Sequence, residues 1–205
     1  MARDTQSIVK MSRREGYALH PKAHKALAKR TSKPGQAANA RMRNKPSQYS
    51  LQLREKQKVK RLYGLLEKQF SNLMAEASRT PGQSGATLLQ YLERRLDNTV
   101  YRAGFAPSRR AARQLVTHGH FMLNGRRVDI PSIRVREGDL VELRPRSKES
   151  EYFKKLDDIS PVPSAITTWQ SVDRKKIQLK VTGLPVRDDA EPEINEQLIV
   201  EYYSR

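Results

Sequence analysis

Arginine dominates the residues of this sequence that could do chemistry. Five arginines fall within the 23 residues APSRRAARQLVTHGHFMLNGRRV (106–128), three of them before an Asn-Gly pair and two after it. A guanidinium stays charged, and its planar set of donors can pair with phosphate through two hydrogen bonds or stack on a base. The pattern therefore indicates recognition of a polyanion, and it does not by itself distinguish RNA from DNA.

No catalytic arrangement accompanies these arginines. Asp97 lies in RRLDNT (94–99), which is superficially similar to the Arg-Leu-Asp catalytic motif of pseudouridine synthases. It falls inside a predicted amphipathic helix, where we interpret it as a surface carboxylate, and no second domain remains that is long enough to build an active site. No other nucleophile–base pair or glycine-rich phosphate loop is visible. We therefore expect a protein that is not an enzyme and uses no cofactor.

The metal-binding potential of the sequence is low. His20 and His24 have the i,i+4 spacing of a metal site on a helix, but no carboxylate cluster supports them. We interpret both as polar residues that face solvent or phosphate. The absence of cysteine excludes disulfides and thiolate metal sites, so we expect no bound metal.

The charge balance points to the same kind of partner. The 205 residues carry 40 Lys and Arg against 22 Asp and Glu, a formal net charge of +18. The net charge is +10 over residues 1–46, +4 over 47–86, +6 over 87–150 and −2 over 151–205. A polyanion should therefore contact the first three segments, whereas the acidic segment should face something else, such as a basic protein. No apolar run suits a membrane span or a secretion signal, so we expect a cytoplasmic location.

The N-terminal half predicts a basic arm followed by helices. Residues 1–46 hold twelve cations and little apolar content, which favours an extended arm that is mobile until it binds a polyanion. Residues 51–78 read as one long amphipathic helix, because apolar residues recur from Val59 to Ala77 at three- and four-residue steps. Its other face has five cations within eight residues, with Glu55 the only acid, which favours phosphate contact over a merely solvated face. TPGQSG (80–85) breaks this helix, and residues 88–103 form the next one, ended by Gly104.

The arginine-rich stretch predicts a helix and a hairpin. Ser108 is a suitable N-cap, and on the helix that follows Ala112 and Val116 lie opposite the arginines. Gly119 ends the helix, and FMLNGRRVDI (121–130) predicts a β-hairpin with a type I′ turn at Asn-Gly. SIRVREGDLVELRP (132–145) adds two short strands, so residues 87–150 should be two helices on a small antiparallel sheet. We expect this unit to present the helix and hairpin arginines on one continuous surface.

The rest of the chain is mixed. Residues 151–192 contain four prolines at irregular spacing and one predicted strand, KIQLKVT (176–182). INEQLIVEYYS (194–204) predicts a short closing helix on which Ile194, Leu198 and Tyr202 share a face.

At this point the sequence resembles a known family, bacterial ribosomal protein four of the small (30S) subunit. The residues that carry the resemblance are SRREG (12–16), PGQ (34–36), YSLQLREKQKVKRLYG (49–64), LERRLDNTVYRAGFAPSRRAARQLVTHGHFMLNGRRVDIPS (92–132) and INEQLIVEYYSR (194–205). The central motif also occurs in the RNA-binding module of tyrosyl-tRNA synthetases, some pseudouridine synthases and a small heat-shock protein. The QLREKQKVKRLYG and LIVEYYSR stretches are much more specific to the ribosomal protein.

The resemblance implies an α+β fold with five parts. Residues 1–46 are the basic extended arm, and 47–86 form a mainly helical domain that is completed by the C-terminal helix 193–205. Residues 87–150 are an inserted small RNA-binding domain of two helices on a short antiparallel β-sheet, and 151–192 are its mixed extension. Some members of the family hold zinc through four N-terminal cysteines, which this sequence lacks.

The resemblance also implies the function. The family binds the five-prime domain of 16S rRNA early in subunit assembly, contacts ribosomal protein five and other small-subunit proteins, contributes to decoding accuracy and lines the mRNA entry path. Ala37-Ala38 stand here where many members have His-Gly, so the family's positions in the mRNA-path loop do not carry over exactly. The candidates for that path are Arg41, Arg43 and Lys45. The residues expected to bind rRNA are Arg3, Lys10, Arg13, Arg14, Lys22, Arg54, Lys56, Lys58, Arg61, Arg95, Arg109, Arg110, Arg113, Arg126 and Arg127.

Two other binding functions explain less of the chain. A stand-alone RNA-binding stress factor would account for the central module but not for the basic arm, the QLREKQK helix or the acidic segment. A general DNA-binding protein would account only for the charge.

Overall fold

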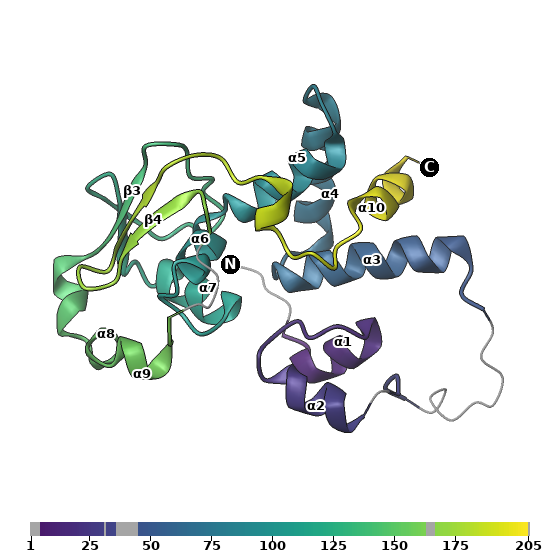
Figure 1. Cartoon of the computed structure of the whole chain (residues 1–205), viewed down its shortest axis with the longest axis horizontal. Coiled ribbons are helices and arrows are strands. Elements are labelled where there is room, and N and C mark those ends of the chain that lie inside the picture. Colours follow the sequence, from purple (N-terminus) through teal and green to yellow (C-terminus); the bar gives the residue numbers. More distant parts are fainter. Residues whose placement is uncertain (1–4, 31, 36–44, 163–166, 205) are drawn as a thin grey trace. The chain divides into compact units, whose positions relative to one another are not determined.

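The computed structural model describes residues 5–30, 32–35, 45–162 and 167–204. They belong to two compact units: unit 1 comprises residues 1–88 with 193–205, and unit 2 comprises residues 89–192. Unit 2 thus interrupts unit 1 in the sequence (Figure 1). None of the helices in the described ranges is long and apolar enough to cross a membrane.

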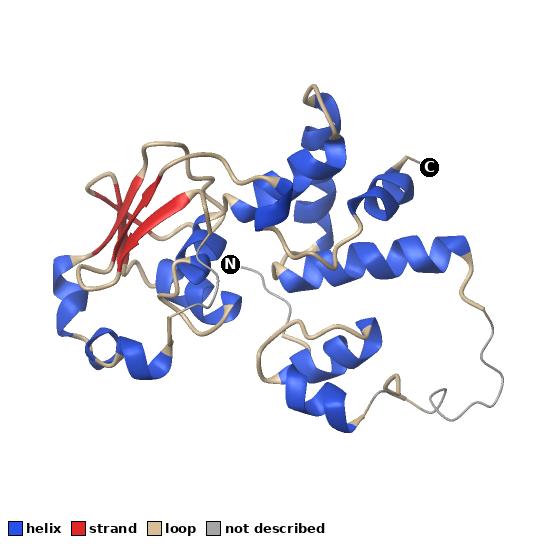
Figure 2. Cartoon of the chain, viewed as in Figure 1, coloured by secondary structure: helices blue, strands red, loops and turns tan. Residues whose placement is uncertain are grey.

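The described part of unit 1 consists of helices joined by loops, without strands (Figure 2). Its helices are α1 (Ile8–Glu15), α2 (Ala23–Lys29), α3 (Gln48–Leu62), α4 (Glu67–Arg79) and α10 (Glu196–Tyr203), while α5 (Ser84–Glu93) begins in unit 1 and ends in unit 2. The hydroxyl of Ser47 accepts a hydrogen bond from the Ser50 amide at 3.3 Å and so caps the start of α3. Val59 and Phe70, both fully buried, anchor α3 and α4 in the core.

The described part of residues 1–46 is helical, so the prediction that it is extended is wrong, whereas its mobility before binding stays a prediction. Helices α1 and α2 pack on each other and bury Met11, Leu19 and Ala23. The carboxylate of Glu15 then joins α1 to α3, because it forms ion pairs with Arg54 and Arg61. These buried residues and the Glu15 ion pairs are contacts that the composition of the segment alone does not predict.

The predicted single helix over residues 51–78 is two helices. α3 ends at Leu62 because Gly64 adopts a left-handed conformation, φ +67°, which a residue with a side chain rarely takes. The Leu65 amide then bonds to the Lys60 carbonyl at 2.9 Å and the Gly64 amide to the Arg61 carbonyl at 3.2 Å, the pattern of a Schellman C-cap. The apolar period continues across the break, which is why the sequence did not show it.

α10 packs along α3 (Figure 1). The Lys56 ammonium, on a side chain 3% exposed, pairs with Glu67 of α4 and lies 4.7 Å from the centre of the Tyr202 ring. The Tyr203 hydroxyl donates to the same Glu67 carboxylate at 3.1 Å, and Gln52 of α3 donates to Glu201 at 2.8 Å. The closing helix predicted from the sequence is confirmed, but its most buried residue is Ile199 rather than the three predicted to share a face.

Unit 2 combines helices with one antiparallel sheet, as the predicted α+β fold requires. Its helices are α6 (Leu96–Arg102), α7 (Arg109–Thr117), α8 (Glu151–Lys154), α9 (Leu156–Ile159) and the 3-10 helices η2 (Pro145–Glu149) and η3 (Arg187–Asp189). Its strands are β1 (Phe121–Leu123), β2 (Arg126–Val128), β3 (Leu140–Leu143), β4 (Gln170–Asp173) and β5 (Gln178–Val181), in the sheet order β2-β1-β3-β5-β4.

The Asn-Gly hairpin is confirmed. β1 and β2 pair antiparallel with Leu123 opposite Arg126, and the two residues between them, Asn124 and Gly125, have φ values of +50° and +76°. These are the positive-φ positions of a type I′ turn. The Asn124 side chain also accepts a hydrogen bond from the Leu140 amide at 2.9 Å, which fixes the hairpin against β3.

Two predicted elements of unit 2 differ in the structure, and one strand was not predicted. The predicted helix 88–103 breaks at Arg94-Arg95, because the backbone there bonds to residues 131–135 instead of continuing the helix: the Leu96 amide donates to the Ile133 carbonyl at 2.8 Å. The same bonds leave residues 132–136 with a single β-bridge, Arg95 to Arg134, where a strand was predicted. The strand predicted at KIQLKVT is confirmed as β5, whereas its partner β4 was missed.

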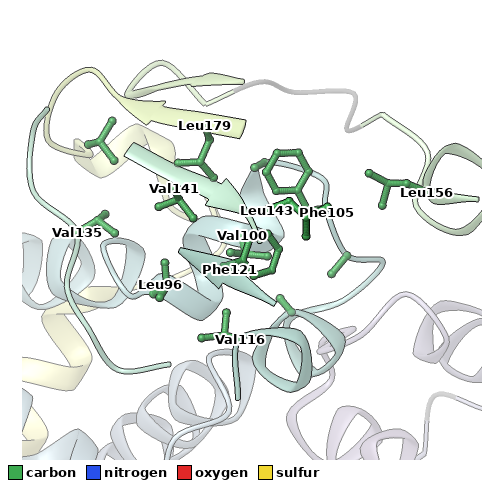
Figure 3. Close-up of a cluster of buried hydrophobic side chains, with 14 of the residues drawn as sticks. Leu96, Val100, Phe105, Val116, Phe121, Val135, Val141, Leu143, Leu156 and Leu179 are labelled. Atoms are coloured by element: carbon green, nitrogen blue, oxygen red, sulfur yellow. The ribbon is translucent and has the colours of Figure 1, made fainter. Parts of the chain in front are cut away.

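The core of unit 2 lies between the sheet and helices α6 and α7 (Figure 3). Leu96 and Val100 of α6 and Val116 of α7 meet Phe121 of β1, and all four are fully buried. Phe121 stacks on Phe105 with 6.2 Å between ring centres. Because α7 and β1 share this core, the arginines that flank them are held on rigid elements.

We predict that the Glu67 carboxylate makes unit 1 sensitive to acid. Burial raises the pKa of Glu67, but hydrogen bonds from Lys56 and Lys60 and their positive charges outweigh burial and lower it to about 2. Since the folded pKa is below that of the unfolded chain, the stabilisation is present above pH 4.5, the ordinary value for Glu, and is lost as the pH falls toward 2.

Thermal unfolding followed by circular dichroism tests this prediction. The melting temperature of Glu67→Gln should be lower than that of the wild type near neutral pH, and the difference should shrink as the pH falls below 4.5. Glu193→Gln removes the same charge from an exposed residue of unit 1 and serves as the control. A constant difference between Glu67→Gln and the wild type at all pH values would contradict the assignment.

Candidate nucleic-acid interface

Helix α7 carries its arginines on a well-defined frame. The Ser108 hydroxyl accepts a hydrogen bond from the Ala111 amide at 3.3 Å, which confirms the predicted N-cap. Ala112 and Val116 are fully buried, whereas Arg110 is exposed. The helix thus has the predicted apolar side, but its three arginines have different surroundings.

Asp97 lies at the centre of the first set of contacts. It is 4% exposed in the first turn of α6, so the interpretation as a surface carboxylate is wrong. Arg95 donates to its two oxygens at 2.8 and 3.1 Å, Arg113 of α7 donates at 3.3 Å, and the Asn98 amide donates at 3.0 Å. Burial lowers the pKa of the Arg113 guanidinium, and the Asp97 charge acts in the opposite direction. The carboxylate therefore offsets the cost of placing two guanidinium groups in a partly buried site.

Glu93 organises a second set of contacts. Its carboxylate is fully buried and accepts hydrogen bonds from Arg102 at 2.8 and 3.0 Å and from the Asn98 side chain at 2.7 Å. The side-chain oxygen of Asn98, Oδ1, in turn accepts a hydrogen bond from Arg109 at 2.9 Å, and Glu191 pairs with the same guanidinium at 3.0 Å. The two outer arginines of the predicted α7 surface, Arg109 and Arg113, are thus engaged with carboxylates of unit 2.

The hairpin arginines face opposite sides of the sheet, because successive residues of a strand alternate. Arg126 is paired in register with Leu123, which packs toward the core, whereas Arg127 is paired with Met122. Both are exposed, and neither has a side-chain hydrogen bond or ion pair among the described residues. The structure therefore brings Arg95, Arg109 and Arg113 into one acid-paired cluster and does not gather all five arginines of residues 106–128 there.

The predicted rRNA-binding residues of unit 1 also divide into exposed cations and cations that bind other groups of the protein. Lys10, Arg14 and Lys22 are exposed, and the half-buried Arg13 donates to the Ser32 carbonyl at 3.0 and 3.2 Å. The predicted cations of α3 are all paired: Arg54 and Arg61 with Glu15, Lys56 with Glu67, and Lys58 with Glu55 at 2.8 Å. From the sequence, only the acid within the cation-rich stretch of α3 was counted. Glu15 and Glu67 were therefore missed, because they come from other helices.

Some predicted residues cannot be placed. Arg3, Arg41 and Arg43 lie outside the described residues, whereas Lys45 is exposed three residues before α3. His20 precedes α2, so it does not share a helix with His24, and its ring nitrogen accepts a hydrogen bond from the Lys22 amide at 3.0 Å. In the described part of the chain, no three His, Asp or Glu side chains are placed to hold a metal ion.

Sequence reasoning passed over several exposed cations of unit 2. Arg144 is half-buried after β3, and Arg136, Arg146 and Lys148 are exposed. The signal available was the spacing of four cations over residues 136–148, interrupted by the three acids Glu137, Asp139 and Glu142. The two strands predicted over residues 132–145 did not separate these cations from the acids, so only the three-dimensional structure shows which of the cations lack acidic neighbours.

Residues 94–141 match the S4 domain family, and residues 3–93 match the family described as the ribosomal protein S4/S9 N-terminal domain. These matches define a class of protein, basic RNA-binding proteins built around an S4 domain. The two matches adjoin at residues 93 and 94, where α5 ends.

Full-length relatives identify the family. The chain is 50% identical to the small ribosomal subunit protein uS4 of Chlorobaculum tepidum and 49% identical to that of Chlorobium phaeovibrioides. It is 48% identical to that of Clostridioides difficile, and each comparison covers 100% of both chains. The chain therefore belongs to the uS4 family of small ribosomal subunit proteins. This confirms the predicted resemblance, and because the family consists of ribosomal proteins it also confirms that the chain is not an enzyme.

We predict that Arg95 stabilises the fold of unit 2, whereas an exposed arginine of the same charge does not. Arg95→Ala leaves one fewer cation against the buried Asp97 and should destabilise unit 2 by about 2–3 kcal/mol. Trp169, the one tryptophan of the sequence, is 2% exposed in the unit 2 core, so its fluorescence reports the unfolding of this unit in urea.

The matched control for Arg95→Ala is Arg110→Ala. It removes the same charge from an exposed position of α7, so the midpoint of the urea transition should stay close to that of the wild type. Equal shifts of the midpoint for the two variants would contradict the structural role of Arg95.

Proposed function

We propose that this chain is a structural constituent of the small ribosomal subunit that binds the five-prime domain of 16S rRNA and nucleates assembly of the subunit body. The observation that carries this proposal is the full-length identity of 48–50% to uS4 proteins, with both domain matches in one chain. The net charge of +18 agrees with a phosphate-rich partner. The protein would act in the cytoplasm as part of the ribosome.

Unit 2 supports rRNA binding through its rigid frame. Arg110, Arg126 and Arg127 are exposed on elements that share the Phe121 core, and phosphate contacts need such fixed geometry to set a register on RNA. Arg109 and Arg113 could reach phosphate by exchanging a carboxylate partner. We propose that unit 2 is the inserted RNA-binding module, with residues 151–192 as its extension, and that unit 1 supplies further phosphate contacts through Lys10, Arg14 and Lys22.

The contact with ribosomal protein five and the role in decoding accuracy are also proposals. They are supported by the family resemblance and by the acidic balance of residues 151–205, which is −2 in a strongly basic chain. Asp188 and Glu193 are exposed in this segment and would suit a basic protein surface.

Sedimentation tests the proposed function. The chain should remain with the small subunit after a high-salt wash, and purified protein should prefer rRNA over duplex DNA when the two compete at one salt concentration. Release of the protein by the wash together with equal competition by DNA would contradict a place in the subunit.

We further propose that Arg41, Arg43 and Lys45 line the mRNA entry path. Cations beside a single strand hold its backbone and oppose re-pairing. Subunits that carry all three alanine substitutions should therefore assemble normally, as judged by sedimentation, and translate structured mRNA more slowly than unstructured mRNA.

A charge-matched variant controls for the loss of three cations. Lys25→Ala, Lys29→Ala and Arg30→Ala remove three exposed cations in and after α2 and should leave the ratio of the two translation rates unchanged. An assembly defect with equal slowing on both kinds of mRNA in the Arg41, Arg43 and Lys45 variant would instead assign these residues to rRNA binding.

A further inference from the structure

Two groups of unit 2 cations differ in their ion-pair partners. Arg95, Arg102, Arg109 and Arg113 pair with carboxylates within 4 Å. A second set, Arg127, Arg144, Arg146 and Lys148, has no carboxylate within that distance among the described residues. These four come from β2 and from the segment that follows β3, and the positive charge they carry is not compensated inside the protein.

The Arg127 side chain packs against the backbone of Gly119, which leaves room for it because it has no side chain. It follows α7 with φ +71°, and a Cβ atom placed there would lie 2.6 Å from Nε, 2.9 Å from Nη2 and 3.2 Å from Cζ of Arg127. The guanidinium therefore lies directly on the backbone at the carboxyl end of α7, where the helix dipole favours a cation. Any side chain at position 119 would have to displace it.

The η2 segment is tied to the same place. The Arg144 amide donates to the His120 carbonyl at 2.8 Å, and the His120 ring bonds to the Ser147 hydroxyl at 3.0 Å. Burial lowers the pKa of His120, and the nearby charges of His118 and Arg144 lower it further. His118, Gly119 and His120 thus join Arg127 on one side to η2 on the other.

We propose that Arg127, seated on Gly119, and Arg144, Arg146 and Lys148 form one site for the phosphate backbone of rRNA. This inference rests on the proposed function and assigns the phosphate contact of unit 2 to this edge, in addition to the α7 arginines. Uncompensated cations on a rigid frame bind phosphate without first giving up a carboxylate partner, and they read backbone geometry rather than base sequence. Gly119 acts as a positioning residue through Arg127.

The first test removes two cations of the site. Full-length chain carrying Arg146→Ala and Lys148→Ala should bind a transcript of the 16S rRNA five-prime domain roughly tenfold more weakly at about 150 mM salt, and the slope of log affinity against log salt should fall by about two. Lys175→Ala with Lys176→Ala removes the same charge from exposed residues of the β4–β5 turn and should change the slope much less.

The second test addresses the positioning of Arg127 by Gly119. Gly119→Ala should weaken binding in the wild-type background and have no further effect in an Arg127→Ala background. Gly138→Ala is the matched control, because Gly138 also has a positive φ, +85°, but a Cβ there would meet nothing within 4 Å. Both substitutions strain the backbone, so Trp169 fluorescence should show similar losses of stability, whereas only Gly119→Ala should lose affinity for RNA.

The outcomes separate this inference from the proposed function. Failure of the wild-type chain to bind the transcript in preference to duplex DNA would overturn the proposed function. Wild-type binding with equal salt slopes for the Arg146/Lys148 and Lys175/Lys176 variants would overturn the phosphate site alone. Equal affinities of Gly119→Ala and Gly138→Ala would overturn the role of Gly119.

Discussion

Two buried carboxylates set the geometry on which the arrangement of unit 2 depends. Glu93 ends α5 and Asp97 lies in the first turn of α6, and between them they hold Arg95, Arg102 and Arg113 within hydrogen-bond distance. A carboxylate without partners would be costly in this setting, so the guanidinium groups must stay close and the helices that carry them cannot move apart. The break between helices α5 and α6, the position of α7 and the position of Glu191 all keep arginines and carboxylates of unit 2 in contact.

The same requirement divides positive charge into two kinds. Arginines that neutralise Glu93 and Asp97 stabilise the fold, and a phosphate can recruit them only by exchange. The cations around Gly119 and η2 pair with no carboxylate among the described residues, so a phosphate can bind them without displacing one. A strongly basic protein therefore does not offer all of its charge to RNA, and the salt dependence of binding should report a number of contacts well below the formal charge.

Local signals were the predictable part of the fold. Ser108 as an N-cap, Asn124-Gly125 as a hairpin turn and the strand at KIQLKVT each depend on a few neighbouring residues, and all three are confirmed. The breaks at Gly64 and at Arg94-Arg95 were missed because the apolar period runs through them, and the second break is stabilised by bonds to residues some 40 positions away. The pairing of α3 with Glu15 was missed for the same reason, since an acid distant in sequence is invisible to a local count.

The placement of α10 in unit 1 has a consequence for synthesis. Helix α3 leaves the ribosome early, but the helix that covers Lys56 is made only after the whole of unit 2. At about 5–20 residues per second that delay is on the order of ten seconds. During this interval unit 2, which is continuous in sequence, can complete its own core, whereas the first unit stays open along one side. A nascent chain that stops before Ile199 would present that open side to chaperones and proteases, so unit 1 closes only when α10 has been made.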